Sequence, residues 1–459
     1  MSKMSLKKKQ LSFSILISVL FLGVSYSVSF FLPSLLWHVP SWLYPEDLFA
    51  TLRDAHMILW GGYGIIYSGG SGLLAPPLGP LVLTPLAYLI DAFKLLEPYP
   101  QPFPDPTAWP LALAYLAPFL GIWTYNVLRF YERHIGTDRF GFVLTGITTI
   151  GAGFVLFPWG HPEDLIALTL CLVIFERLED DRITSASYIA GIALSFQPFV
   201  VLFLIPLWVL RIRSMRVFLS SFARVIFIPA LLYAPTLLAD FKATLAATVH
   251  QPNFPRIDHL TILGLLTLSK GQVMAGPLRI IMVLAAIAIG FIGKSRLDLF
   301  TQSWREVFLV STVALSLRIW LEPVMVPYYA VPFLVFAMLL VPTQKRMRLT
   351  YLFVSGALCF AVIFAASLGL VPLQYTVILY LATLATIAAL FQAAMLDNCF
   401  IKKTISDEIW TYMKSNKYVS DVKQAPVEAE INRNNAIRRF YGKKTPIYQM
   451  EENWEVDKS

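Results

Sequence analysis

Charged residues are scarce in this chain. Asp, Glu, Lys and Arg make up 14% of its 459 residues, whereas hydrophobic residues make up 57% and aromatic residues 14%. Soluble domains carry about 25% charged residues. The composition, together with a mean hydropathy of +0.63, therefore excludes an ordinary water-soluble globular protein.

Cysteine and the common catalytic motifs are nearly absent as well. Cys171, Cys359 and Cys399 lie in or beside apolar runs without metal-ligand spacing, so we expect neither a disulfide nor a zinc site. The sequence has no glycine-rich phosphate loop, no zinc-binding motif, no nucleophile elbow and no visible internal repeat. P-loop, zinc-protease and serine-hydrolase chemistries therefore have no support in the sequence.

The net charge does not indicate a nucleic-acid partner. It is +8, but Lys and Arg fall in short loops between apolar runs and form no basic patch. Positive residues beside membrane-spanning segments favour the cytoplasmic side. We therefore use these loops to assign the two sides of a membrane, and we expect no binding to nucleic acid.

Long apolar runs dominate what is present. Several reach the roughly 18 to 20 residues that cross a hydrocarbon layer as a helix. The sequence thus predicts an all-α polytopic membrane protein, a bundle of about 11 to 13 transmembrane helices. Lys7, Lys8 and Lys9 place the N-terminus in the cytoplasm, and we expect the first helix, 11–36, to be retained and not cleaved as a signal peptide.

A long extracytoplasmic loop, 37–108, follows the first helix. Near its start, apolar residues recur at helical spacing, namely Leu48, Leu52, Ala55 and Leu59. They predict an amphipathic helix lying in the membrane interface. Residues 61–72 are too rich in glycine for a regular helix. The proline-punctuated stretch 78–96 is predicted to be re-entrant or interfacial, with a full span as the alternative.

The remaining predicted spans fill a membrane domain that covers residues 1–396. They are 109–128, 140–157, 165–175, 217–238, 277–292, 307–317, 331–340, 351–370 and 373–395. The stretch 183–210 has basic residues on both flanks and a break at Gln197 and Pro198, which predicts a hairpin of two short helices. Residues 397–459 are predicted to form a cytoplasmic tail of mixed charge, so both termini face the cytoplasm.

The sides assigned from Lys and Arg also sort other residue types. Five of the six histidines fall on the extracytoplasmic side, all except His134. Further ionisable residues join them there, namely Asp47, Asp54, Glu163, Asp164, Arg318 and Glu322. Such sorting predicts a polar site that opens at one end of a helix bundle.

The turn 157–165 holds the densest group of these residues, His161, Glu163 and Asp164. Pro162 suits the first position of a helix, and the two acids suit its first turn. Ordinary helix capping is therefore one interpretation of the turn. It leaves His161 unexplained, and the alternative is that all three side chains belong to a membrane-protein active site.

The other candidate residues have two interpretations as well. Asp47 and Asp54, seven residues apart, share a helix face that either points into water or lines the site. Arg318 either lies at the membrane surface, pairing with Glu322, or binds a phosphate through its planar guanidinium. Tyr328 either belongs to a belt of interface aromatics or contacts the substrate.

Four stretches follow the acidic residue of the first loop in a recognisable order. They are a Gly-x-x-x-x-Tyr element at 62–67, a double-proline run at 76–89, GHPEDLIALTL at 160–170 and AGIALSFQPFVVLFLIPLWVLRIR at 190–213. This order resembles the GT-C membrane glycosyltransferases, most closely glycosyltransferase family 87, the polyprenol-phosphate-mannose-dependent α-mannosyltransferases. The resemblance covers the first half of the chain. The sequence departs from the family at 160–163, where members often have G-Q-x-N, and at Gln197, where they commonly have lysine.

The resemblance implies a GT-C-like fold and an inverting transfer of a mannose-like sugar from a polyprenol-phosphate donor to an extracytoplasmic glycan or glycolipid. It assigns the general base to Asp47, with Glu46 and Asp54 as alternatives. The other implied contacts are phosphate binding by Arg318, His161, His250 and His259, acceptor binding by Glu163 and Asp164, and further substrate contacts by Asp54, Glu322 and Tyr328. No metal is obligatory and no cofactor is expected, because the leaving group is a lipid monophosphate.

Two other classes of function stay open on the sequence. A transporter or flippase places its ionisable residues in mid-bilayer and often has repeated halves, whereas here they lie at helix ends and no repeat is visible. A catalytically silent scaffold would bind partners through the tail. We expect the enzyme, with membrane lipid, the lipid-linked donor and the acceptor as its partners.

Overall fold

The structure is a computed structural model of the chain. It describes residues 8–23, 46–68, 76–95, 108–136, 139–156, 160–212, 214–248, 252–253, 261, 273–296, 304–322, 327–340, 381, 383, 384 and 387. The predicted span 351–370 and the predicted tail 397–459 lie outside the described residues, as does most of the predicted span 373–395.

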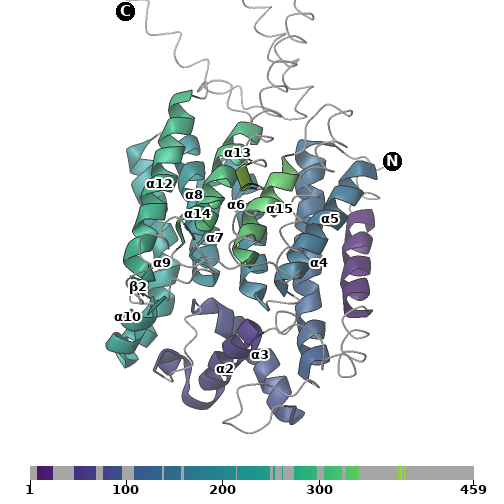
Figure 1. The fold of residues 1–459 in the computed structure, drawn as a ribbon, viewed down its shortest axis with the longest axis vertical. Helices are drawn as coiled ribbons and strands as arrows, with labels where there is room; N and C mark the ends of the chain where they lie inside the picture. Colours follow the sequence, from purple (N-terminus) through teal and green to yellow (C-terminus); the bar gives the residue numbers. More distant parts are fainter. Residues whose placement is uncertain are drawn as a thin grey trace, which may run out of the picture.

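The described part of the chain is helical apart from one pair of two-residue strands (Figure 1). A first helix covers 8–23. The later helices are α2 (Glu46–Gly61), α3 (Leu78–Ala92), α4 (Trp109–His134), α5 (Arg139–Leu156), α6 (Pro162–Glu179), α7 (Ile183–Phe196), α8 (Val200–Arg211), α9 (Met215–Ala239), α10 (Phe241–Thr248), α12 (Ala275–Arg296), α13 (Trp304–Leu315), α14 (Leu317–Leu321) and α15 (Val331–Leu339). The 3₁₀ helices η2 (Tyr63–Ile65) and η6 (Pro327–Ala330) and the antiparallel strands β1 (Pro252–Asn253) and β2 (Val273–Met274) complete the order.

Proline sets two helix boundaries that the sequence predicted. α6 begins at Pro162, whose missing N–H has no partner in a first turn. α7 ends at Phe196 and α8 begins at Val200, so the predicted break at Gln197 and Pro198 is confirmed. α7 packs mainly on α6 and α9, whereas α8 packs mainly on α12 and α13. Each of the two short helices therefore has its own partners in the bundle.

α2 and α3 form a small hydrophobic core at one end of the bundle, the lower end in Figure 1. The buried residues of α2 in this core are Leu48, Leu52 and Ala55. They pack against α3 and the start of α4, while Leu59 is 36% exposed. The predicted amphipathic helix is thus confirmed, but protein covers its apolar face where we expected the membrane interface. The predicted re-entrant stretch is the regular 15-residue helix α3, which includes Pro85.

A second and larger core holds the rest of the bundle together. Phe308 of α13 lies at its centre, with ring centroids 5.0, 5.0, 5.6 and 5.3 Å from Phe130, Phe175, Phe203 and Phe336. These rings come from α4, α6, α8 and α15 and are fully buried. Such aromatic pairs contribute about 0.5 to 1.5 kcal/mol each beyond the burial of their area. They fix the C-terminal half of α6 relative to α13 and α15.

The two cores are joined by few side chains. Phe21 of the first helix and Phe119 of α4 pack against both of them. The residues of α2 belong to the small core alone, and those of α6, α13 and α15 belong to the large one. α2 is therefore seated on the bundle and is not part of its interior.

A glycine allows a close approach between the backbones of α7 and α9. A Cβ added at Gly191 of α7 would lie 2.6 Å from the backbone oxygen of Val225 in α9. We expect Gly191→Ala to destabilise the protein by about 1 to 3 kcal/mol, because backbone must move to admit the methyl group. Gly146→Ala in α5 is the matched control, since its Cβ would meet no described atom within 4 Å. Unfolding midpoints of the two variants in detergent test this, and equal midpoints would contradict it.

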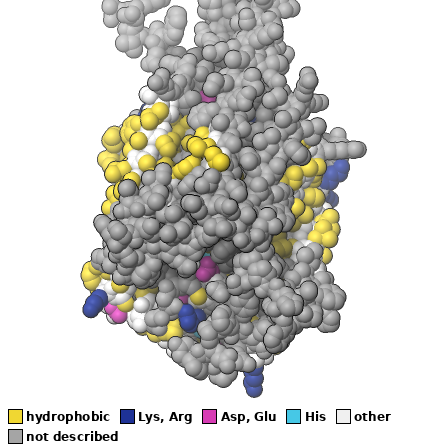
Figure 2. Space-filling view, in the orientation of Figure 1, with side chains coloured by type: hydrophobic (Ala, Val, Ile, Leu, Met, Phe, Trp, Pro, Cys, Tyr) yellow, Lys and Arg dark blue, Asp and Glu magenta, His cyan; other side chains and the backbone are white. Residues whose placement is uncertain are grey.

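Among the described residues, two helices are long and apolar enough to cross a membrane, Leu111–His134 within α4 and α9. The apolar window of α4 is 56% buried inside the protein, but that of α9 is only 6% buried. α9 therefore exposes a row of large apolar side chains, namely Met215, Leu219, Phe222, Ile226, Phe227, Leu231 and Leu238. In Figure 2 hydrophobic side chains dominate the described surface on both flanks. These features agree with a membrane protein, and the number of crossings stays a prediction.

The end of α6 that lies away from α2 is surrounded by ion pairs. The carboxylate of Glu179, 2% exposed, lies 3.6 Å from Arg133, 3.1 Å from His134 and 3.7 Å from Arg211. Arg133 and Arg211 lie in the last turns of α4 and α8, beside basic segments that the positive-inside rule assigns to the cytoplasmic side. α6 therefore has ionisable groups at both ends and an apolar stretch between them.

Candidate functional site

The turn before α6 places His161 at the mouth of the bundle. Gly160 has a φ of +67°, a left-handed conformation that glycine adopts without a steric penalty. His161 is the N-cap residue but makes no capping hydrogen bond with its side chain, and Pro162 follows at the first helical position. Helix capping therefore does not occupy the imidazole, which is free to turn towards other elements.

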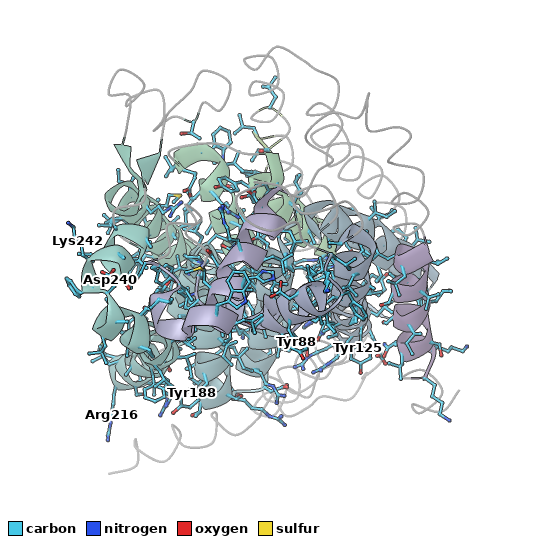
Figure 3. The ribbon with its side chains drawn as sticks, turned by 90° about the horizontal axis from the view of Figure 1, so that it is seen from below. Tyr88, Tyr125, Tyr188, Arg216, Asp240 and Lys242 are labelled. Carbon is cyan, nitrogen blue, oxygen red and sulfur yellow. The ribbon has the colours of Figure 1, made fainter. Side chains whose placement is uncertain are left out.

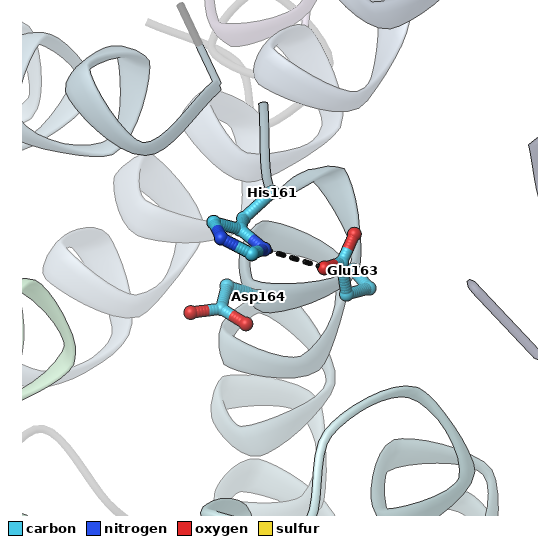
Figure 4. A group of neighbouring side chains, drawn as sticks. All are labelled: His161, Glu163 and Asp164. Carbon is cyan, nitrogen blue, oxygen red and sulfur yellow. Dashed lines mark hydrogen bonds and ion pairs between the residues drawn. The ribbon is translucent and has the colours of Figure 1, made fainter. Parts of the chain in front are cut away.

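Both ring nitrogens of His161 face carboxylates, and Figure 4 shows the one that belongs to Glu163. Its Nδ1 lies 2.7 Å from Oε1 of Glu163 in the same turn. Its Nε2 lies 2.8 Å from Oδ2 of Asp47 on α2, 114 residues away in sequence. The amide of Gln197 donates a longer hydrogen bond of 3.4 Å to the same oxygen of Glu163. Three separate stretches that the sequence had singled out thus meet at one imidazole.

This arrangement favours a protonated His161. Neutral imidazole donates from one nitrogen only, so two flanking carboxylates are both satisfied only by imidazolium. Burial lowers the pKa of His161, but the Glu163 carboxylate and the hydrogen bonds to Asp47 and Glu163 outweigh burial and raise the pKa to about 10. Below that pH the imidazole is a cation between two acids.

Arg318 supplies a second cation on the other side of the turn. Its Nη1 lies 3.5 Å from Oδ2 of Asp164, a carboxylate with 0% exposure. Its guanidinium carbon lies 3.8 Å from the ring centroid of Tyr329 and 4.6 Å from that of Phe199, a cation–π arrangement. Burial raises the pKa of Asp164 to about 6, although Arg318 and His161 act in the opposite direction.

Tyr328 closes the group over the imidazole. Its ring stacks on His161 with a centroid distance of 4.2 Å and an interplanar angle of 30°. The side chain is buried, with 7% exposure, so the interpretation of Tyr328 as an interface-belt aromatic is wrong. We call Asp47, His161, Glu163, Asp164 and Arg318 the His161 cluster, with Tyr328 as its aromatic cover.

The members of the His161 cluster differ in access to solvent. The side chain of Asp47 is 34% exposed, against 8% for His161, 3% for Glu163 and 0% for Asp164. Figure 3 views this end of the molecule, where α2 crosses the middle of the bundle and Lys242 of α10 lies at the rim. Asp47 is therefore the most solvent-accessible carboxylate of the His161 cluster.

Comparison with known proteins assigns no family to the chain. No protein-family model and no curated protein matches it. The resemblance to family 87 mannosyltransferases therefore remains an expectation from the motifs between residues 62 and 213. Function has to be argued from the chemistry of the His161 cluster itself.

One of the alternatives open for Arg318, a pair with Glu322, is not formed among the described contacts. Arg318 does not take Glu322 as its hydrogen-bond partner; the oxygen Oε1 of Glu322 lies 2.7 Å from Nε and 2.5 Å from Nη2 of Arg279. Arg279 belongs to α12, and α12 packs against α14, which contains Arg318. The sequence suggested Arg318 as the partner of Glu322 because the two residues are only four positions apart. Arg279, which is 43 positions before Glu322, reaches it because α12 packs on α14.

The other predicted site residues have different outcomes. Asp54, 3% exposed, is buried on α2, so its face does not point into water as one interpretation held. Its charge acts on Tyr67, whose ring stacks on Tyr233 of α9 at 6.2 Å, and no described contact brings it to His161. The side chain of Glu46 and the residues His250 and His259 lie outside the described residues.

Three residues that contact the site were not predicted from the sequence to belong to it. Arg279, Phe199 and Tyr329 all contact predicted site residues. Arg279 stands near the start of a predicted span on the extracytoplasmic side, and Tyr329 adjoins Tyr328, so both carried a positional signal. Phe199 had none, because an aromatic residue in an apolar run is indistinguishable from core in sequence.

Proposed function

We propose that this protein is a polytopic membrane glycosyltransferase of the GT-C type, which transfers a sugar, mannose-like, from a polyprenol phosphate to an extracytoplasmic glycan or glycolipid. The observation that supports this most is the contact between Asp47 and His161. It joins the residue assigned as general base to the turn assigned as substrate-binding. Both assignments come from the resemblance, and the two residues, 114 positions apart in sequence, are 2.8 Å apart in the structure.

A bilayer is the environment that suits the exposed surface of the bundle. Large apolar side chains face outwards from three separate helices: Leu11, Ile15 and Val19 on 8–23, Leu219, Phe222 and Leu231 on α9, and Ile280, Leu284 and Phe291 on α12. Contiguous apolar surface of this kind is rare on soluble monomers. We propose that these faces contact lipid, within the predicted bundle of about 11 to 13 crossings.

Membrane sidedness follows from the two polar ends of α6. The network around Glu179 contains arginines from predicted cytoplasmic loops, and the His161 cluster lies at the opposite end of the same helix. By the positive-inside rule the His161 cluster then faces the extracytoplasmic side. A polyprenol-linked donor presents its sugar at such a boundary, because the lipid chain stays in the hydrocarbon.

In this proposal Asp47 acts as the general base. The acceptor hydroxyl attacks the anomeric carbon, the bond from that carbon to the phosphate oxygen breaks, and Asp47 takes the hydroxyl proton. Its partial exposure permits contact with an acceptor, whereas Glu163 and Asp164 are too enclosed to serve as the base. His161 orients the Asp47 carboxylate through Nε2 and is itself held by Glu163.

The departing phosphate needs positive charge nearby. Arg318 is enclosed, with a side chain 10% exposed, and is already paired with Asp164. Arg279 is paired as well, with Glu322, but its side chain is more accessible at 31%. We therefore propose that Arg279 contacts the lipid phosphate directly, while Arg318 balances the charge of Asp164 and supports the aromatic cover. This revises the role that the resemblance implied for Arg318.

The experiment is a transfer assay with the purified full chain in proteoliposomes. Polyprenol-phosphate mannose and polyprenol-phosphate glucose are supplied as separate donors with a mixture of membrane glycolipid acceptors, and products are identified by mass. Appearance of a glycolipid heavier by one hexose is the expected result. Movement of the donor between leaflets without any transfer would overturn the proposal in favour of a flippase.

Membrane sidedness has its own prediction. A reporter fused after Lys294, at the end of α12, is expected to be cytoplasmic, because this loop is predicted to be on the side of the Glu179 network. A reporter inserted after Gly160 serves as the opposite control and is expected to be extracytoplasmic. Alkaline phosphatase and fluorescent-protein fusions measure the two positions. An extracytoplasmic signal after Lys294 would place the His161 cluster on the wrong side for this proposal.

A further inference from the structure

We propose that His161, Glu163 and Asp164 bind a divalent cation of the manganese or zinc kind. The binding itself is argued from the described side chains alone. Any part that the ion plays in sugar transfer rests on the proposed function. From the sequence we expected that the departing lipid phosphate does not require a metal. The site proposed here is therefore an addition to that expectation.

The three side chains are close enough to share one ion. One potential ligand atom from each of them lies within 4.8 Å of the others. Ligand atoms bound to a single ion at about 2.1 Å are about 3.0 to 3.4 Å apart in octahedral or tetrahedral geometry. Nδ1 of His161 and Oε1 of Glu163 are 2.7 Å apart already. Small side-chain rotations therefore suffice to admit an ion (Figure 4).

Two buried carboxylates in this group have oxygen atoms that lack a donor. Oε2 of Glu163 and Oδ1 of Asp164 are inaccessible to solvent and accept no hydrogen bond from any described residue. The residues are 3% and 0% exposed. Leaving a charged acceptor buried without a partner is costly. A cation bound between these carboxylates and the imidazole would satisfy both oxygens.

The charge of the His161 cluster also favours a divalent ion. With neutral His161, the carboxylates of Asp47, Glu163 and Asp164 and the guanidinium of Arg318 sum to −2. A proton on His161 leaves −1, whereas a divalent cation brings the sum to zero. Buried charge is stable when it is balanced locally. The proton on His161 and the cation are thus alternative occupants, and only the cation neutralises the group.

The donor set and its surroundings indicate the kind of ion. One imidazole nitrogen with carboxylate oxygens suits manganese or zinc better than calcium or magnesium, which prefer all-oxygen sites. An ion on Nδ1 leaves Nε2 to donate its proton to Asp47 at 2.8 Å. Such an imidazole between a metal and a carboxylate is fixed in one tautomer. The ion would therefore also orient the residue proposed as base.

The test is metal binding by the purified full chain, first freed of metal with a chelator and then dialysed against manganese or zinc. We expect one ion per chain, and affinity lowered in Glu163→Gln by more than the roughly 10- to 100-fold that follows loss of an outer hydrogen-bond partner. Asp91→Asn is the matched control, because Asp91 pairs with His56 at the same end of the molecule. Equal binding by wild type and Glu163→Gln would overturn the inference.

A second measurement needs only the wild-type chain, in case a variant does not fold. Pulsed electron paramagnetic resonance of the manganese-loaded protein is expected to show coupling to one imidazole nitrogen. Bound manganese without nitrogen coupling would overturn the inference. The two proposals fail separately: a bound ion without sugar transfer contradicts only the proposed function, and transfer by a chain that binds no ion contradicts only this inference.

Discussion

Asp47→Asn is expected to lower sugar transfer by about 10²- to 10⁴-fold, the range that a positioned general base contributes. Asparagine keeps the shape of the side chain and can still hydrogen-bond to Nε2 of His161, but it cannot accept the acceptor proton. Folding should change little, because the Asp47 side chain is one-third exposed. The measurement is initial rate per folded protein in proteoliposomes, at saturating donor.

The structure offers a closely matched control for this substitution. Asp91 on α3 also pairs with a histidine, His56, at 3.0 Å, and its side chain is 33% exposed against 34% for Asp47. Both aspartates belong to the α2–α3 end of the molecule. Asp91→Asn removes the same charge from the same region but lies outside the His161 cluster. If the two variants lose activity equally, the loss is electrostatic or structural and Asp47 is not the base.

Arg318→Met is expected to have the largest effect on stability, a loss of about 3 to 5 kcal/mol. Methionine retains much of the apolar stem, but Asp164 is then buried without its cation, and the cation–π contacts with Tyr329 and Phe199 disappear. Arg279→Met is the comparison, since the Arg279 side chain is 31% exposed against 10% for Arg318, so water screens the Arg279–Glu322 pair more and a smaller loss is expected. Unfolding by denaturant in detergent micelles, followed by tryptophan fluorescence, measures both.

A double substitution separates lost charge from lost packing. Arg318→Met combined with Asp164→Asn removes both charges, so its loss should be smaller than the sum of the two single losses by about 1 to 3 kcal/mol. Strict additivity would mean that the 3.5 Å pair is not coupled. Equal stability of Arg318→Met and Arg279→Met would likewise remove the argument that the His161 cluster is a balanced buried unit.

Local chemistry made much of the fold predictable. The start of α6 at Pro162 and the break before Val200 follow from the missing N–H and fixed φ of proline. The amphipathic period of α2 is visible in its leucines. The sequence does not show what covers the apolar face of α2, so we predicted contact with the membrane interface where α3 packs instead. It also gave no reason to choose between a regular helix and an irregular stretch around Pro85.

The sequence predicted which residues lie at the same end of the bundle, because membrane sidedness can be assigned from the basic loops. Asp47, His161 and Arg318 were expected at one end of the bundle because basic loops mark the other, and the structure brings all three together. Pairing within that end was not predictable. Glu322 takes Arg279 because α12 packs on α14, a tertiary fact that spacing along the chain does not encode.

The residue proposed as base and the residues that hold it belong to different hydrophobic cores. Asp47 is on α2, in the small core with α3, whereas His161 begins a helix of the large core. The distance between Asp47 and His161 therefore depends on how the small core of α2 and α3 is positioned on the large core that contains α6. A cavity such as that left by Leu86→Ala in α3 would misalign the pair without touching a charge. Under the proposed function, the rate of sugar transfer would therefore be sensitive to substitutions in the small core that change no charged residue.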